Sequence, residues 1–137
     1  MIEQIAVFME NRQGRLQEFT KVLAGAGISL RTLSIADTSD FGILRVITSD
    51  NRKAVKALKE NGFTVTSSML IGVEVCDESG GLASVLAVLD AHNVGIEYIY
   101  SFAHTNDNKA VILFRADDDV RASEVLKRNG VKTLDKI

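Results

Sequence analysis

The feature that most constrains the fold is a six-residue pattern that occurs twice in the chain. Residues 11–16 read Asn-Arg-Gln-Gly-Arg-Leu and residues 77–82 read Asp-Glu-Ser-Gly-Gly-Leu. Each copy follows a short apolar run and precedes a segment with apolar residues at helical spacing. The glycines at positions 14 and 80 are 66 residues apart, close to half of the 137-residue chain. The sequence therefore predicts two related units.

Each half predicts the order strand, helix, strand, strand, helix, strand. After the first turn, Leu16, Phe19 and Leu23 fall at the spacing of an amphipathic helix. Turn-forming residues at 37–40 and 105–108 predict hairpins. We expect helices after residues 14, 50, 80 and 117, and strands over residues 2–9, 28–36, 42–48, 63–75, 96–103, 110–115 and 131–134.

The repeat extends beyond the turns. Leu23 corresponds to Leu89, and Leu58 corresponds to Leu126 after the second half has gained two residues between its second strand and second helix. No linker rich in proline, glycine or serine separates the halves. We therefore expect an α+β fold of two ferredoxin-like units, residues 1–68 and 69–137, whose antiparallel sheets carry helices on one face and share or closely continue one strand.

Composition and charge exclude several classes of protein. The net charge is −2, and the halves carry about +2 and −4, which is too little for a nucleic-acid-binding surface. Cys76 is the single cysteine, so an intrachain disulfide and a cage of several thiolates are excluded, and we interpret it as a small hydrophobic residue at a strand end. No apolar run is long enough to span a bilayer, and residues 1–20 lack the layout of a signal peptide. We expect a cytoplasmic protein without nucleic-acid or membrane partners.

The repeated turn has a chemistry of its own. A strand that ends in a glycine turn and starts a helix gathers free backbone N–H groups, which can receive an anion. Glycine at positions 14, 80 and 81 also removes the side-chain bulk that would keep a ligand from the backbone. Two such turns predict two related binding sites, or one site that both turns share.

A tandem unit whose first turn reads Asn/Asp-x-x-Gly-x-Leu resembles a pair of ACT domains, which are small regulatory modules that bind amino acids. The resemblance covers almost the whole chain and includes the entries to the second strands, residues 23–30 and 89–99. The family commonly has Asp-x-Pro-Gly-x-Leu at this turn, whereas this chain has no proline and has Asn11 in its first copy. Family members are usually attached to an enzyme that they regulate.

The resemblance implies a specific site. ACT domains pair side by side through their second strands and first helices, and ligands lie between the first turn of one unit and the second strand of its neighbour. The helix-start N–H groups would hold the carboxylate of an amino acid, and side-chain or strand oxygens would accept from its ammonium group. The candidate ligand-binding residues are Asn11, Gln13, Gly14, Arg15, Leu16, Ser29, Leu30, Asp77, Ser79, Gly80, Gly81, Leu82, Gly95 and Ile96.

These residues also have structural interpretations. Gly14 and Gly80 suit any turn that needs a positive φ, and Asp77 suits a turn or a helix cap. Arg12 and Arg15 are either solvated surface charges or a clamp on a ligand carboxylate. The second turn, with two glycines and an acidic partner, is the favoured seat.

Other candidate groups have structural explanations. The three aspartates at 117–119 resemble an acidic metal-binding patch, but helix capping explains them. His92 and His104 have no second ligand motif nearby, so no metal is expected. Tyr98 and Tyr100 alternate onto one strand face, which favours packing in a core or an interface over ligand stacking.

No catalytic constellation emerges from the sequence. We expect a non-enzymatic regulatory protein without a cofactor, a homodimer that binds a free amino acid, with a metabolic enzyme as a candidate partner. The alternative is a ligand-free ACT subunit for interaction or dimerisation that associates with a metabolic enzyme. A third reading, a small enzyme on a ferredoxin-like scaffold, has no motif to support it.

Overall fold

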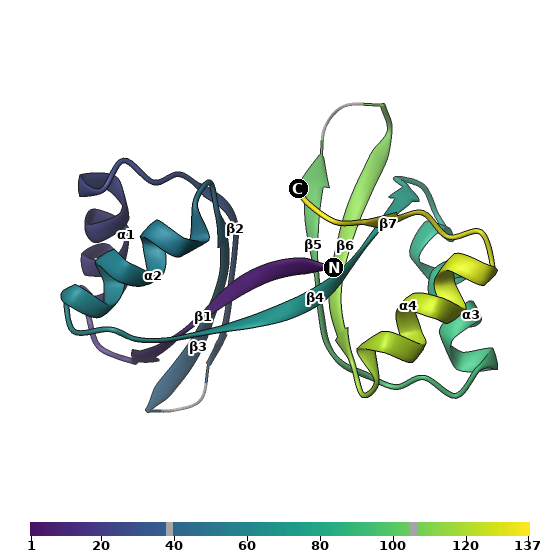
Figure 1. The fold of residues 1–137 in the computed structure, drawn as a ribbon, viewed down its shortest axis with the longest axis horizontal. Helices are drawn as coiled ribbons and strands as arrows, with labels where there is room; N and C mark the ends of the chain where they lie inside the picture. The colour runs from purple at the N-terminus through teal and green to yellow at the C-terminus, as the bar shows by residue number, and fades with distance from the viewer. Residues whose placement is uncertain (38–39, 105–106) are drawn as a thin grey trace. The chain divides into compact units, whose positions relative to one another are not determined.

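The computed structural model describes residues 1–37, 40–104 and 107–137 (Figure 1). The predicted turn residues 38–39 and 105–106 lie outside the described residues. The elements, in chain order, are β1 (Ile2–Glu10), α1 (Arg15–Gly25), β2 (Leu30–Asp37), β3 (Phe41–Thr48), α2 (Asn51–Glu60), β4 (Thr64–Cys76), α3 (Gly81–Ala91), β5 (Ile96–His104), β6 (Lys109–Ala116), α4 (Asp119–Arg128) and β7 (Thr133–Leu134).

The chain divides into two compact units. One consists of residues 3–68, and the other consists of residues 69–137 together with residues 1–2. We call them the first and the second unit. The continuous strand β4, of 13 residues, begins in the first unit and ends in the second, which confirms the prediction of one strand without a linker.

In the first unit the strand order is β2-β3-β1-β4, the ferredoxin-like arrangement. Both β1 and β2 pair antiparallel with β3, and α1 and α2 lie together on one face of the sheet (Figure 1). The apolar positions of β1 alternate, so Ile5, Val7 and Met9 face the helices and join the core. From the helices, Phe19, Leu23, Ala54 and Leu58 complete that core.

The second unit repeats this plan. Its strand order is β4-β6-β5, with β7 beside β4, and α3 and α4 cover one face (Figure 1). Ile71, Val73, Leu89, Phe114 and Leu126 are among its fully or almost fully buried core residues. The predicted α+β class and ferredoxin-like units are confirmed.

Local signals explain where the second helices of both units begin. The side chain of Asp50 accepts a hydrogen bond from Lys53 N at 2.9 Å, and that of Asp118 accepts one from Arg121 N at 3.0 Å. These contacts satisfy N–H groups that a helix start leaves free. The predicted capping by the aspartates at 117–119 is confirmed for Asp118, the N-cap residue of α4.

The last strand is shorter than predicted. We expected a strand over residues 131–134, but β7 contains only Thr133 and Leu134. The N–H of Val131 donates to Leu126 O at 3.0 Å, so this residue completes the C-terminal turn of α4. The strand can therefore begin only after the helix end has been closed.

Candidate functional site

The first repeated turn connects β1 to α1 through a glycine. Gly14 is the N-cap residue of α1, has φ 86°, in the left-handed region, and makes no side-chain cap bond. Arg15 N donates to Arg12 O at 3.3 Å, and Glu18 N donates to Gly14 O at 3.0 Å. The positive end of the α1 dipole is therefore open to an anion.

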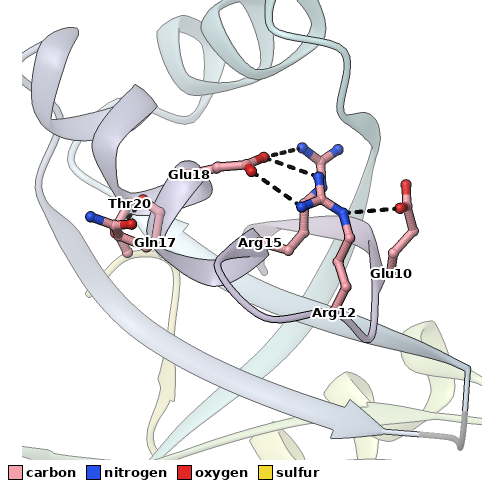
Figure 2. A network of polar contacts seen from close by, with 6 residues as sticks. All are labelled: Glu10, Arg12, Arg15, Gln17, Glu18 and Thr20. Carbon is pink, nitrogen blue, oxygen red and sulfur yellow. Dashed lines mark hydrogen bonds and ion pairs between the residues drawn. The ribbon is translucent and has the colours of Figure 1, made fainter.

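Four charged side chains form a network over this turn (Figure 2). The Arg12 guanidinium donates to both oxygens of Glu18 at 3.3 Å, and its Nε donates to Glu10 Oε2 at 3.3 Å. Arg15 Nη1 donates to Glu18 Oε2 at 2.8 Å. The hydrogen bonds from Arg15 and Arg12 lower the pKa of Glu18, and those to Glu18 raise the pKa of Arg12. Two positive and two negative groups thus face each other.

Arg15 is much more enclosed than Arg12. Its side chain is 13% exposed, against 49% for Arg12. Its guanidinium carbon lies 3.8 Å from the centre of the Phe63 ring, a cation–π contact. Arg15 Nε is buried and has no hydrogen-bond partner among the residues that the structure describes. Arg15 is therefore a fixed part of the first unit, whereas Arg12 is exposed to solvent.

A hollow of about 190 Å³ lies beside the first turn. Its lining combines an apolar wall with a charged rim and consists of Met9, Glu10, Asn11, Arg12, Arg15, Leu16, Ile35 and Gly42. The sequence predicted three of these residues as ligand contacts, namely Asn11, Arg15 and Leu16, while Gln13 and Gly14 belong to the adjoining turn. It missed Met9, Glu10, Ile35 and Gly42.

The pairing register explains why Ile35 and Gly42 lie near the first turn. Glu10 pairs with Phe41, and Asp37 pairs with Gly42, so the end of β1 lies beside the β2–β3 hairpin. The predicted hairpin, taken with an antiparallel partner for the first strand, is the sequence signal that would have found them.

Ser29 and Leu30 lie at the opposite end of the same sheet. Leu30 pairs with Thr48 at one end of β2, and Asp37 pairs with Gly42 at the other end, beside the hairpin. Ser29 is engaged there, since its N–H donates to Ser49 Oγ at 3.0 Å and its carbonyl accepts from Ser49 N at 2.8 Å. One unit by itself therefore does not bring the residues at 29–30 to the turn at 11–16.

The second turn differs from the first in its backbone packing. Gly80 has φ 91°, but the next residue, Gly81, lies so close to the Cys76 carbonyl that a Cβ at this position would overlap the oxygen. In the repeat, Gly81 corresponds to Arg15. The hollow here, of about 450 Å³, is lined by Glu74, Val75, Cys76, Glu78, Ser79, Gly80, Gly81, Ser84, Val85, Gly130, Val131 and Lys132. Three of the predicted residues, Ser79, Gly80 and Gly81, line this hollow, while Asp77 and Leu82 flank them in the chain.

Gly95 and Ile96 repeat the arrangement of the first unit. Gly95 N donates to Asp117 Oδ2 at 3.1 Å, and Asp117 N donates to Gly95 O at 3.0 Å. Ile96 pairs with Ala116, whereas Cys76, at the end that leads to the second turn, pairs with Lys109. The strand entry and the turn are again at opposite ends of one sheet.

Near the second turn, Glu74 carries two lysine contacts. Its Oε1 accepts hydrogen bonds from Lys132 Nζ and Lys109 Nζ, each at 2.9 Å. These two hydrogen bonds lower the pKa of the Glu74 carboxyl. The cluster links β4 to β6 and to the segment before β7.

Residues considered as metal or thiol sites have structural contacts or stand alone. Among the described residues, no three His, Cys, Asp or Glu side chains form a group that would hold a metal ion. Asp119 Oδ1 accepts from Ala116 N at 2.8 Å, a bond that ties the first residue of α4 to the end of β6. Cys76 lies at the end of β4, where the sequence predicted a small strand-end residue, and its free thiol is exposed. None of the described helices has the length and apolar character to cross a membrane.

Comparisons with known proteins found one matching family model and several similar structures. A family model described as an ACT domain pair matches residues 1–136. Protein BT0572 from Bacteroides thetaiotaomicron has a similar structure, with 46% identity and a TM-score of 0.91 over 97% of this chain and 91% of that one. The ligand-free regulatory subunit of aspartate kinase from Thermus thermophilus matches with 16% identity and a TM-score of 0.62, over 92% of this chain and 91% of that one. Aspartate kinase from Synechocystis matches with 21% identity and a TM-score of 0.54, over 90% of this chain but 24% of that one. A comparison with curated proteins found no match.

Proposed function

Because this chain belongs to the ACT domain family, as a domain pair, we propose that it is a non-catalytic regulatory protein that binds a free amino acid at an interface between ACT units. ACT domains are regulatory modules and are generally non-catalytic. The observation that carries the proposal is the first turn, where the start of α1 after Gly14, two guanidinium groups and the Glu10 carboxylate line one hollow, and Glu18 holds both guanidinium groups. We treat residues 1–68 and 69–137 as the two domains.

The charges at the first turn suit a zwitterion. A carboxylate is stabilised by the α1 N-terminus and by the exposed guanidinium of Arg12. An ammonium group has Glu10 and the Asn11 side chain as acceptors on the same rim. Met9 and Ile35 offer apolar surface to a side chain.

The two turns are unequal candidates. The sequence favoured the second turn, because Gly80 and Gly81 leave space for a ligand. However, the carbonyl oxygen of Cys76 points at Gly81 at the start of α3, and a carbonyl oxygen repels a carboxylate. We therefore propose the first turn as the main binding site for the amino acid.

A neighbouring unit completes the proposed site. Ser29 and Leu30 lie far from the turn of their own unit, so in this proposal a second copy of the chain supplies the second-strand residues. The edge strand β2 exposes Leu33 by 49% and Ile35 by 45%, although their partners Val46 and Leu44 are buried in the core. An edge strand with exposed apolar residues is suited to pairing with another chain. This favours a homodimer.

A thermal-shift screen with the twenty standard amino acids tests the function. At tenfold excess over Kd, a bound amino acid adds about 1.4 kcal/mol to the free energy of unfolding. Gly14→Val should remove the stabilisation, because it forces a β-branched residue to a φ of 86° and fills the turn. Gly27→Val is the matched control, since Gly27 has φ 68° and open space but lies at the other end of α1.

The outcomes separate the candidate sites. Loss of stabilisation in Gly14→Val but not in Gly27→Val supports the first turn. Loss of the stabilisation in Gly80→Val alone would place the binding site at the second turn. Silence of the wild-type chain across the whole panel would overturn the proposal.

A second candidate function is an ACT subunit that has no ligand and associates with a metabolic enzyme. It is favoured by the exposed apolar residues on β2 and by the fold shared with the regulatory subunit of aspartate kinase. A purified complex with an enzyme whose stability does not change with any amino acid would support this alternative.

A further inference from the structure

We infer that Glu18 is an internal competitor for the carboxylate of the bound amino acid. In the ligand-free chain Glu18 holds Arg12, and an incoming carboxylate takes Arg12 from it. The inference rests on the function proposed above and names the residue that sets the affinity at the first turn.

Glu18 holds its two guanidinium groups unequally (Figure 2). Its contact with Arg15 is 2.8 Å, a usual length for a hydrogen bond between charged groups, whereas both contacts with Arg12 are 3.3 Å. The Arg12 side chain is 49% exposed and that of Arg15 is 13% exposed. Arg12 is therefore the partner that exchanges, and Arg15 is the partner that stays.

Release of Arg12 leaves no charge unpaired at this turn. Glu18 keeps Arg15, which is fixed against Phe63. Arg12 keeps its Nε contact with Glu10, at 3.3 Å, and already lines the hollow. The ligand carboxylate thus takes the place of the Glu18 carboxylate at the exposed guanidinium of Arg12. Because one exposed ion pair replaces another, little free energy opposes the exchange.

The second unit provides an internal comparison. At an offset of 66 residues, Glu78 stands in place of Arg12 and Ser84 stands in place of Glu18. The guanidinium and its competitor thus occur together at the first turn, and both are replaced at the second. Ser84 Oγ donates instead to Gly80 O at 2.9 Å, a contact between α3 and its own N-cap residue.

The test uses Glu18→Gln in the full chain, with Glu124→Gln as the matched control. Glu124 is an exposed carboxylate on α4 of the second unit, so its replacement makes the same change in net charge without touching the first turn. Binding is measured by thermal shift and calorimetry with the twenty amino acids and with their carboxamides, which lack the carboxylate. Thermal unfolding without additive checks that each variant is folded.

We expect Glu18→Gln to bind the amino acids about two- to five-fold more tightly, the change set by an exposed ion pair. Its affinity for carboxamides and the affinity of Glu124→Gln for both panels should not change. Arg12→Gln should weaken amino-acid binding, and in the double variant the gain from Glu18→Gln should disappear, because both act through one contact.

The possible failures are distinguishable. If the wild-type chain binds an amino acid but Glu18→Gln behaves like Glu124→Gln, the competitor role is wrong and the proposed function stands. Equal tightening for amino acids and carboxamides would mean that Glu18 does not compete with the ligand carboxylate, which also overturns the inference. If neither the wild-type chain nor Glu18→Gln binds any amino acid, both proposals are wrong.

Discussion

At Gly81 the second turn leaves no room for a side chain. A Cβ at this position would overlap the carbonyl oxygen of Cys76, which belongs to the backbone and cannot rotate away. The corresponding residue of the first unit is Arg15, which carries a long side chain. The two turns share a sequence pattern, but the position after the repeated turn glycine must be glycine in the second unit and accepts a long side chain in the first.

This contact predicts the effect of one methyl group. Gly81→Ala should lower the free energy of unfolding by about 1–3 kcal/mol, the usual cost of overpacking. Gly25→Ala is the control, because Gly25 lies at the end of α1 with open space around its Cα, and alanine is favoured over glycine in a helix by about 0.5–1 kcal/mol. Urea unfolding of both variants measures the difference, and equal stability of Gly81→Ala and the wild-type chain would contradict the contact.

The residues of the first turn were only partly predictable. Asn11 and Arg15 are visible in the sequence because they lie inside the repeated pattern. The burial of Arg15 against Phe63 is not visible in the sequence, since that contact joins residues 48 positions apart and depends on how α1 packs. Sequence reasoning left Arg15 open between a surface charge and a ligand clamp; in the structure it is enclosed by its own unit.

Among the elements, the second half of β4 is linked to β6 and to the segment before β7 by ion pairs of Glu74. This carboxylate accepts from Lys109 on β6 and from Lys132 just before β7, and Glu74 N also donates to Lys132 O at 3.0 Å. The side chain of Glu74 is 20% exposed, less than either lysine. The short strand β7 thus depends on contacts outside its own two residues.

The Glu74 contacts predict a pH dependence of stability. The lysines lower the pKa of Glu74 in the folded chain, so its contribution is present above about pH 4.3, the usual value for glutamate, and is lost as the pH falls through the lowered value. Glu74→Gln should have a lower Tm than the wild-type chain at pH 7, and the difference should shrink on acidification to pH 3. Calorimetry at a series of pH values measures it. Glu124→Gln is the control, because it keeps the contacts of Glu74 with both lysines. If the Tm difference between Glu124→Gln and the wild-type chain shrank on acidification in the same way, the assignment to Glu74 would be contradicted.

Element identities were predictable because their signals are local. The caps Asp50 and Asp118, the apolar spacing of Phe19 and Leu23, and the uninterrupted segment 63–75 each appear within a short window of sequence. Ile35 and Gly42 were missed as lining residues because their place depends on the register between strands. The length of β7 was predicted wrongly because Val131 suits both the end of a helix and the start of a strand. In the structure its N–H donates to Leu126 O and so closes the end of α4.

At the scale of the whole molecule, the exposed edge β2 predicts an association between chains. Ile35→Lys should convert a dimer to a monomer, because a charged residue on an edge strand opposes pairing. Val120→Lys is the control, since Val120 on α4 is 64% exposed and belongs to the second unit. Sedimentation equilibrium distinguishes the two states. A monomeric wild-type chain would contradict the proposed pairing, as would a dimer that tolerates Ile35→Lys.

The membership of residues 1–2 in the second unit has a consequence for synthesis. Ile2 is 3% exposed, and a Cβ at Gly72 would overlap its Cδ1, so it lies directly on the backbone of β4. The ribosome makes Ile2 before every residue of the second unit that it packs against. Residues 3–68, which form the first unit, have all left the exit tunnel before most of the second unit is made, and until then Ile2 remains exposed to solvent. Ile2 is therefore made before the first unit but reaches its native contacts only after it.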